Sequence, residues 1–444
     1  MAAPVLAALL GWAPGAGAGV SPGEAAKLKG ELTPLGAEKA GNKDGTIPAW
    51  TGGYTKPIPG FTNGGRRPDP FADEKPKLQI TAANLAQHAD RLSEGLQAML
   101  RKYPTFRIDV YPTHRTAAAP DWVYENSFRN ATRASLDGHK LTGAYGGIPF
   151  PIPKSGEEAM WNHELRWRGT AWHVDIRGMQ TTSSGQHVPS VFASGDFQMP
   201  YYFQDGSPES FKGEYWMIRM LNYGPPIRAG EAIVGRQNID QDDTKIWVYF
   251  TGQRRSRKLP NACCDTPTPA SAGISSFDQT DVFGGRMDRF DWKIIGKKEM
   301  YVPYNTNRSL QRPAKDILLA NHLNPDDVRF ELHRVWVIEA TVAPGKRHLA
   351  AKRRYYLDED TWTAVLADHW DANGQLWQMG FAMPMVLPDL PATVSPSIFG
   401  FYDLLSGAWY YDSILNDADE HYKIVPRYSD TTFTPEAMAG EGVR

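Results

Sequence analysis

Residues 332–381 decide the fold, and they read LHRVWVIEATVAPGKRHLAAKRRYYLDEDTWTAVLADHWDANGQLWQMGF. Four runs rich in β-branched and aromatic residues occupy this stretch, at residues 332–342, 351–357, 362–370 and 375–381. Apolar residues alternate along the first run, and short polar turns separate the runs. Because no helix fits between successive runs, we expect antiparallel strands and exclude a doubly wound parallel sheet.

Three further strands are expected upstream, at residues 215–221, 246–250 and 290–295. The run at 246–250 is apolar on both faces, so the sheet must be covered on both sides. Helical spacing of apolar residues predicts one amphipathic helix at residues 81–102, with Thr81 as its N-cap, and a shorter helix at 313–323.

The composition supports a β-rich protein. The 444 residues include 41 Gly, 34 Pro, 14 Trp, 19 Tyr and 18 Phe, a balance that favours turns and strands over long helices. The formal net charge is −2 and there is no large basic block, so nucleic acid is excluded as a partner.

The chain divides into three parts. Residues 4–18 are apolar or small and end in a small-x-small pattern at Ala16-Gly17-Ala18, which predicts a signal peptide at residues 1–18. The positive first region is missing, which leaves a late start codon or a flexible Ala/Gly tail as alternatives. Residues 19–77 form a Gly/Pro-rich arm, and residues 78–444 form one large β-rich domain. We therefore expect an exported, soluble, periplasmic protein.

Cys263 and Cys264 are adjacent. Neighbouring Cα atoms lie about 3.8 Å apart, which is below the usual range for a disulfide, so a bond between them would be easily reduced. We expect a reduced or occasionally oxidised pair in a Pro-rich loop, and no metal site there.

Common catalytic and cofactor motifs are absent from the sequence. It contains no nucleophile elbow, phosphate-binding loop, dinucleotide fingerprint or C-x-x-C motif. His163-Glu164 lacks the second His of a zinc protease, and the acidic turn at residues 240–243 lacks the Gly of a calcium loop. We therefore expect no enzyme activity, no catalytic residue, no metal ligand and no cofactor.

Carboxylates near the ends of strands leave one enzymatic alternative. Aromatic-lined carboxylate pairs are the catalytic groups of glycoside hydrolases. Turn formation is the other interpretation, because Asp at a strand end hydrogen-bonds its own backbone. The carboxylates in question are Asp358, Glu359, Asp360, Asp368 and Asp371.

Several stretches together resemble domain-of-unknown-function family 1329 of Gram-negative bacteria. The stretches are residues 32–53, 110–115 (VYPTHR), 147–153 (GIPFPIP) with 161–164 (WNHE), and 296–305 (GKKEMYVPYN). The resemblance implies a fold like that of outer-membrane lipoprotein-sorting proteins: a strongly curved antiparallel sheet, an incomplete β-barrel, closed by a few helices around a lipid-sized cavity. It also implies a link to RND-type exporters, and it assigns no catalytic role to any residue.

These observations predict an α+β, mainly β, carrier or chaperone for a hydrophobic molecule, a lipid or a lipoprotein acyl chain. Burial alone supplies affinity, at about 25 cal/mol per Å² of apolar surface. The alternatives are a secreted glycan hydrolase and a structural partner of an exporter or outer-membrane complex. Candidate lining residues are Trp216, Ile218, Met220, Trp247, Tyr249, Trp336 and Ile338, and candidate head-group contacts are Arg254, Arg255 and Arg257. Ordinary core packing remains an alternative for the first set, and a solvent-facing strand end for the second.

Two structural details are also predicted. Asn373-Gly374 is expected to form a two-residue hairpin turn, which would place Trp370 directly opposite Trp377. The cavity is expected between the concave face of the sheet and the helix at residues 81–102, with a volume of roughly 300–1,000 Å³.

The signal peptide gives the first testable prediction. We expect the mature N-terminus to be Gly19, because small side chains occupy both recognition positions before it. N-terminal sequencing of the exported protein checks this. An intact Met1 on a cytoplasmic pool would contradict export.

Overall fold

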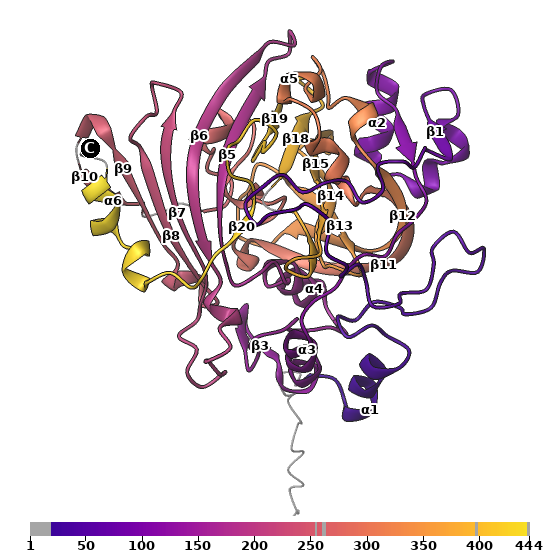
Figure 1. The fold of residues 1–444 in the computed structure, drawn as a ribbon, viewed down its shortest axis with the longest axis horizontal. Helices are drawn as coiled ribbons and strands as arrows, with labels where there is room; N and C mark the ends of the chain where they lie inside the picture. Colours follow the sequence, from indigo (N-terminus) through magenta and orange to yellow (C-terminus); the bar gives the residue numbers. More distant parts are fainter. Residues whose placement is uncertain (1–18, 254, 260–262, 396–397, 442–444) are drawn as a thin grey trace, which may run out of the picture.

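The computed structural model describes residues 19–253, 255–259, 263–395 and 398–441 (Figure 1). The predicted signal peptide and Arg254 therefore lie outside the described residues. The main feature is a sixteen-stranded, mostly antiparallel sheet that does not close into a barrel. The mainly β fold class predicted from the sequence is confirmed.

The first half of the sheet is an antiparallel meander in which each strand pairs with the next along the chain. Its strands are β5 (Ala171–Thr181), β6 (His187–Gln198), β7 (Glu214–Gly224), β8 (Ala232–Asn238), β9 (Lys245–Phe250) and β10 (Arg255–Lys258). The strand β10 forms one edge of the sheet. The strands predicted at 215–221 and 246–250 are confirmed as β7 and β9.

The second half contains the stretch quoted above. Its strands are β11 (Phe290–Pro303), β12 (Phe330–Val342), β13 (Lys352–Asp358), β14 (Ala364–Trp370), β15 (Leu376–Ala382), β18 (Phe399–Asp403) and β19 (Trp409–Tyr411). All the strands predicted in this part are confirmed. The pairing of β19 with β5 joins the two halves into one sheet.

Short strands complete the structure. They are β1 (Leu78–Ile80), β2 (Ile108–Val110) and β20 (Lys423–Ile424) in the large sheet, and the pairs β3 (Ser135–Asp137) with β4 (Lys140–Thr142) and β16 (Met385–Leu387) with β17 (Ala392–Val394). The pairing of β2 with β12 is parallel, and it is limited to Phe330 and Val110.

Helices among the described residues are short and lie around the sheet (Figure 1). They are α1 (Pro22–Ala25), α2 (Glu94–Lys102), α3 (Asp121–Arg133), α4 (Gly156–Glu164), α5 (Ala314–Ile317) and α6 (Pro435–Glu441). The sequence did not predict α3 and α4. None of the helices in this part of the chain is long and apolar enough to cross a membrane.

The helix predicted at residues 81–102 is wrong in its first half. Residues 85–91 form two single 3₁₀ turns, and the helix α2 begins only at Glu94. Ser93 is the N-cap, because its hydroxyl accepts a hydrogen bond from the Leu96 amide at 3.1 Å. The shorter predicted helix is also reduced, to the single turn α5.

Both faces of the second half of the sheet are covered. Every residue of β14 is buried. The helix α2 packs on β14 and β15, and α4 packs on β11 and β12. Cover on both sides, predicted from apolar runs, is confirmed for this half.

The predicted pairing at Asn373-Gly374 is wrong. The turn spans Asp371 to Gly374, whose amide donates to the Asp371 carbonyl at 3.1 Å, and Gly374 takes a left-handed φ of 76°. The turn sets Asp371 opposite Gln375 and Trp370 opposite Leu376 instead of Trp377. A bulge then restores the predicted register, so that His369 pairs with Gln378. The Asn-Gly pair therefore did not fix the pairing next to the turn, because the turn begins one residue earlier than the predicted one.

The arm at residues 19–77 contains α1 and one 3₁₀ turn, and it runs along the outside of the sheet domain (Figure 1). Arg67 fastens it with a bidentate ion pair to Asp389, at 2.7 and 3.0 Å, and a 2.6 Å hydrogen bond to the Tyr422 carbonyl. The division into an arm and one domain stays a prediction.

Asp368 holds the start of α2 against the sheet. Its Oδ1 accepts from the Gly95 amide at 2.9 Å and the Ser93 hydroxyl at 3.2 Å. Its Oδ2 accepts from the Glu94 amide at 3.0 Å and the Tyr356 hydroxyl at 2.9 Å. Burial raises the pKa of Asp368 to about 6, although the hydrogen bonds from Tyr356, Gly95 and Ser93 oppose the rise.

We predict that Asp368→Asn lowers the free energy of unfolding by about 1–3 kcal/mol, because the amide nitrogen cannot accept from the donors that face it. Urea denaturation measures the change. Asp371→Asn is the matched control. Only Oδ1 of Asp371 accepts hydrogen bonds, from the Asn373 and Gln375 amides, and the side-chain oxygen of an asparagine can accept the same bonds. Equal stability of the two variants would contradict this role.

Candidate functional site

A cavity of about 740 Å³ lies between strands β6 to β9 and the long connection from β10 to β11. Its volume falls within the range of roughly 300–1,000 Å³ that is typical of small-molecule sites. The cavity is partly open to solvent, and most of its wall is apolar.

The sheet side of the cavity follows from strand alternation. Trp216, Ile218 and Met220 of β7 point to this face, and the register places Ile218 beside Gly235 of β8 and Ile246 of β9. A Cβ at Gly235 would lie 2.7 Å from Ile218 Cγ2, so this glycine keeps the floor of the cavity open.

The opposite wall comes from the connection between β10 and β11, through its described residues 259 and 263–289. This described part contains short 3₁₀ turns, η7 (Pro269–Ser271), η8 (Phe277–Gln279) and η9 (Met287–Arg289), and an isolated β-bridge between Pro267 and Ser276. Long connections of this kind commonly carry function. The apolar lining residues Leu259, Ala270 and Phe277 come from it.

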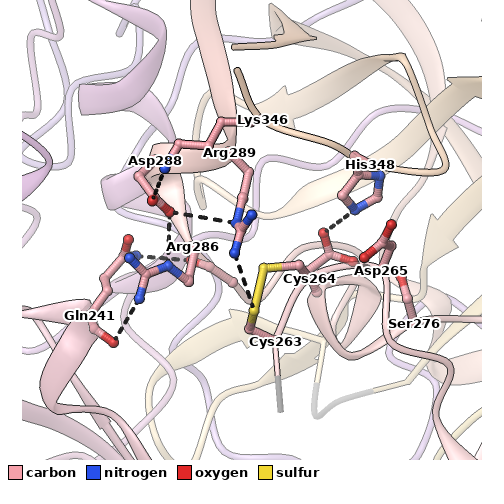
Figure 2. The surroundings of a disulfide bond; sticks show 12 residues. Gln241, Cys263, Cys264, Asp265, Ser276, Arg286, Asp288, Arg289, Lys346 and His348 are labelled. Atoms are coloured by element: carbon pink, nitrogen blue, oxygen red, sulfur yellow. Dashed lines mark hydrogen bonds and ion pairs between the residues drawn. A yellow bond between two sulfur atoms is a disulfide. The ribbon is translucent and has the colours of Figure 1, made fainter. Parts of the chain in front are cut away.

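The adjacent cysteines are part of this wall. Cys263 lines the cavity, and Cys263 and Cys264 form a disulfide (Figure 2). The Arg289 guanidinium donates to Cys263 Sγ at 3.9 Å. The sequence favoured a mainly reduced pair, whereas the structure joins the two sulfur atoms.

Arg286 fixes the connection to the sheet (Figure 2). Its guanidinium contacts Asp288 at 2.8 Å and Asp242 at 2.7 Å. The hydrogen bond to Asp288 is the main cause that raises the pKa of Arg286. The acidic turn before β9, at residues 240–243, therefore helps to hold the connection that forms the far wall of the cavity.

One buried acid lies behind the cavity. Burial raises the pKa of Glu164 to about 7. Its Oε2 accepts from the Tyr215 hydroxyl at 3.3 Å, and its Oε1 accepts from the Gly285 amide at 3.0 Å. Tyr215 also donates to Gln237 at 2.6 Å. These contacts join α4, the sheet and the connection.

Four of the seven predicted lining residues border the cavity. Trp216, Ile218 and Met220 share the cavity wall. Tyr249 also borders the cavity, but with Trp247 it lies on the other face of β9, where both pack in a cluster that includes Phe433. Whether any of them contacts a ligand stays a prediction.

Trp336 and Ile338 lie elsewhere, on β12 in the second half of the sheet. Ile338 is fully buried in the main core. The Trp336 ring stacks on Trp362 with centroids 6.0 Å apart, and Lys297 Nζ lies 4.6 Å from the Trp336 ring centroid. Neither of the two predicted residues borders the cavity.

Two of the predicted head-group residues lie beside the cavity face. Arg255 pairs with Phe250 and Arg257 pairs with Val248, so in this antiparallel pair their side chains share the face of cavity-lining residues. Both arginines are exposed on the edge strand β10. Within the described chain, neither forms an ion pair with a carboxylate.

The predicted cavity boundary is wrong, although a cavity of the expected size is present. The helix α2 lies on β14 and β15, and no residue of the segment 81–102 borders the cavity. The connection at residues 259–289 takes its place. This segment was missed because it is rich in Thr, Ser, Pro and Gly and has no periodicity.

The carboxylates proposed for glycan hydrolysis do not face the cavity. Asp358, Glu359, Asp360 and Asp368 are each at most 2% exposed. Asp371 forms a turn. Asp371 is the one carboxylate of this group that is partly exposed, and it has no exposed carboxylate of the group beside it to form a pair, so the structure does not favour the hydrolase.

Comparisons with known proteins give one family and several similar structures. The family model described as "Protein of unknown function (DUF1329)" matches residues 79–439. An uncharacterized protein of Pseudomonas aeruginosa is 38% identical over 443 residues, which cover 96% of this chain and 95% of that protein.

Solved structures are similar at low sequence identity. A DUF1329 family protein from Desulfovibrio piger is 14% identical, with a TM-score of 0.41, covering 61% of this chain and 92% of that one. A putative outer membrane lipoprotein-sorting protein domain from Vibrio parahaemolyticus is 10% identical, with a TM-score of 0.44, covering 64% and 97%. A LolA superfamily protein from Nitrosomonas europaea is 11% identical, with a TM-score of 0.39, covering 64% and 100%.

Proposed function

We propose that this chain, which belongs to the DUF1329 family, is a carrier that binds a hydrophobic, lipid-like molecule in the cavity. The cavity of about 740 Å³ with its mostly apolar wall supports this proposal most directly. An acyl chain that enters it leaves water and gains about 25 cal/mol per Å² of buried apolar surface. Binding of this kind needs no chemical step.

The edge strand supplies a polar end to the proposed site. Arg255 and Arg257 are exposed and share the face of the cavity-lining residues Phe250 and Val248. A guanidinium binds carboxylate or phosphate oxygens with two parallel hydrogen bonds. The proposed cargo is therefore an amphiphile with an acyl chain and an anionic head group.

The compartment and the partner are proposed on sequence grounds. The predicted signal peptide supports the periplasm. The link to an RND-type exporter or an outer-membrane protein rests on the family resemblance. Native mass spectrometry of protein purified from the periplasm separates the alternatives. Co-purified lipid supports the carrier, bare protein that cleaves a glycan panel supports the hydrolase, and bare protein without activity supports a structural partner.

A charge in the cavity wall tests the site of binding. We predict that Val248→Asp weakens binding of the neutral dye N-phenyl-1-naphthylamine by about tenfold or more, because an apolar ligand would desolvate the new carboxylate. Fluorescence titration measures the affinity. Val188→Asp is the matched control, because Val188 is 39% exposed and does not line the cavity. Equal affinities of the two variants would place dye binding outside this cavity.

The head-group proposal has a separate test. We predict that Arg257→Glu weakens palmitate binding by roughly two- to fivefold at low salt, while dye binding is unchanged. Calorimetric titration measures the palmitate affinity. Lys258→Glu is the matched control, because Lys258 pairs with Trp247 and points to the opposite face of the same strand. A similar loss in both variants would indicate only a general effect of net charge.

A further inference from the structure

A second cluster of polar side chains is buried far along the sheet from the cavity, in the second half of the chain. His333 lies on β12, Asp358 ends β13, and Asp360 lies in the turn that follows. One nitrogen or oxygen atom of each residue lies within 4.8 Å of the others. The three residues are 1%, 0% and 2% exposed.

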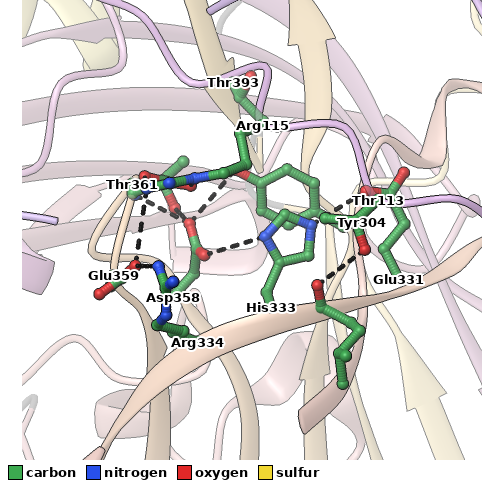
Figure 3. Close-up of polar contacts among 12 residues, drawn as sticks. Thr113, Arg115, Tyr304, Glu331, His333, Arg334, Asp358, Glu359, Thr361 and Thr393 are labelled. Atoms are coloured by element: carbon green, nitrogen blue, oxygen red, sulfur yellow. Dashed lines mark hydrogen bonds and ion pairs between the residues drawn. The ribbon is translucent and has the colours of Figure 1, made fainter. Parts of the chain in front are cut away.

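The His333 ring is oriented by a carboxylate. Its Nε2 lies 3.0 Å from Glu331 Oε2, and Figure 3 shows the ring between Glu331 and Asp358. Glu331 accepts further hydrogen bonds from Arg329 at 2.5 Å and the His114 amide at 2.8 Å, so it faces donors throughout. His333 Nε2 therefore donates to Glu331, and Nδ1 points toward Asp358.

Asp358 has one satisfied oxygen and one free oxygen. Its Oδ2 accepts from the Thr361 amide at 2.9 Å and the Thr361 hydroxyl at 2.7 Å, and the Tyr304 hydroxyl lies at 3.4 Å. Its Oδ1 is buried without a hydrogen-bond partner. No Lys or Arg of the described chain forms an ion pair with Asp358. His333 Nδ1 lies 3.8 Å from Oδ1.

His333 Nδ1 and Asp358 Oδ1 are not joined by a hydrogen bond, because 3.8 Å is too long for one. Asp358 Oδ1 is thus a buried acceptor without a donor, which is unfavourable unless another group binds it. A metal ion binds imidazole nitrogen and carboxylate oxygen at about 2.0–2.2 Å, so two of its ligand atoms lie roughly 3–4 Å apart. The separation of His333 Nδ1 and Asp358 Oδ1 matches that spacing.

Asp360 supplies the third ligand, an oxygen. Arg115 holds it with two hydrogen bonds, Nε to Oδ2 at 2.9 Å and Nη2 to Oδ1 at 2.6 Å. Each carboxylate oxygen keeps a lone pair after one such bond. Every candidate ligand thus has its own positioning partner: Glu331 for His333, Thr361 for Asp358 and Arg115 for Asp360 (Figure 3).

We propose that His333, Asp358 and Asp360 bind one divalent transition-metal ion of the Zn²⁺ class. One imidazole with two carboxylates favours such an ion over Ca²⁺ or Mg²⁺, which prefer oxygen ligands alone. The ion joins β12, the end of β13 and the following turn. It lies beside the docked arm, because Arg115 also donates to the Glu38 carbonyl at 2.8 Å.

The test uses the full chain, stripped of metal with a chelator and then titrated with Zn²⁺ by calorimetry. We expect one equivalent of Zn²⁺ to bind and the melting temperature to rise by about 3 °C or more. Excess Mg²⁺ should not compete. X-ray absorption at the zinc edge should show one imidazole nitrogen with oxygen ligands. Failure of the wild-type protein to bind stoichiometric Zn²⁺ would overturn the proposal.

Variants separate the site from a general effect on folding. His333→Gln and Asp358→Asn should each weaken Zn²⁺ binding by at least about tenfold. His369→Gln is the control, because His369 is equally buried on β14 and its Nδ1 accepts from Gln279 and not from a carboxylate network. Circular dichroism and dye binding in the cavity establish that each variant is folded. A folded His333→Gln variant that binds Zn²⁺ as tightly as the wild type would also overturn the proposal.

The carrier proposal and the metal proposal fail independently. The variant Val248→Asp alters the cavity and should keep full Zn²⁺ affinity, since Val248 lies on β9 in the other half of the sheet. Loss of Zn²⁺ binding in that variant would contradict a site at His333.

Discussion

Apolar side chains on both faces of a sixteen-stranded sheet must be covered, and this constraint shapes the rest of the molecule. In the second half, helices α2 and α4 supply the cover, and β14 is buried along its whole length. In the first half, α6 packs on one face of β8 and β9, while an irregular connection lies over the other. A segment without regular structure cannot fill the concave face completely, and the space that remains is the cavity of about 740 Å³.

The strands could be predicted from the sequence because alternation and aromatic content are local properties. The pairing could not. The turn begins at Asp371, one residue earlier than Asn-Gly predicts, and the bulge between His369 and Trp370 then restores the predicted register; the Asn-Gly signal contains no information on either change. The helix predicted at residues 81–102 was too long for a similar reason. Apolar spacing continues through residues 85–91, but the cap at Ser93 and its contact with Asp368 are set by the sheet, which is distant in sequence.

The candidate sites show the same limit. Trp216, Ile218 and Met220 were identified as one face of a strand, and the structure places them in one wall. The second wall has no periodic pattern. His333 was not connected from the sequence with Asp358 and Asp360, because these lie 25 and 27 positions further along the chain, beyond a long turn. The observed pairing of Val335 with Asp358, extended by two residues, would place His333 opposite Asp360. Register, and not residue type, was the missing information.

The docking of the arm shows why so much charge is buried in this protein. Residues 19–77 are rich in Gly and Pro and have few apolar side chains in phase, so burial alone cannot hold them in one register. Such a segment can still be bound through its backbone carbonyls, which accept hydrogen bonds. The domain meets them with long, buried donors: Arg115 contacts the Glu38 carbonyl at 2.8 Å, and Arg334 contacts the Ala40 carbonyl at 2.9 Å.

Each of these guanidinium groups needs a carboxylate partner to be tolerated in the interior, and Asp360 and Glu359 supply them. The acidic turn after β13 is therefore required by the arm. Asp358, at the end of β13, is the exception, because no arginine of the described chain forms an ion pair with it. Its position at the centre of a network that otherwise pairs its charges is the strongest physical reason to expect a bound cation there.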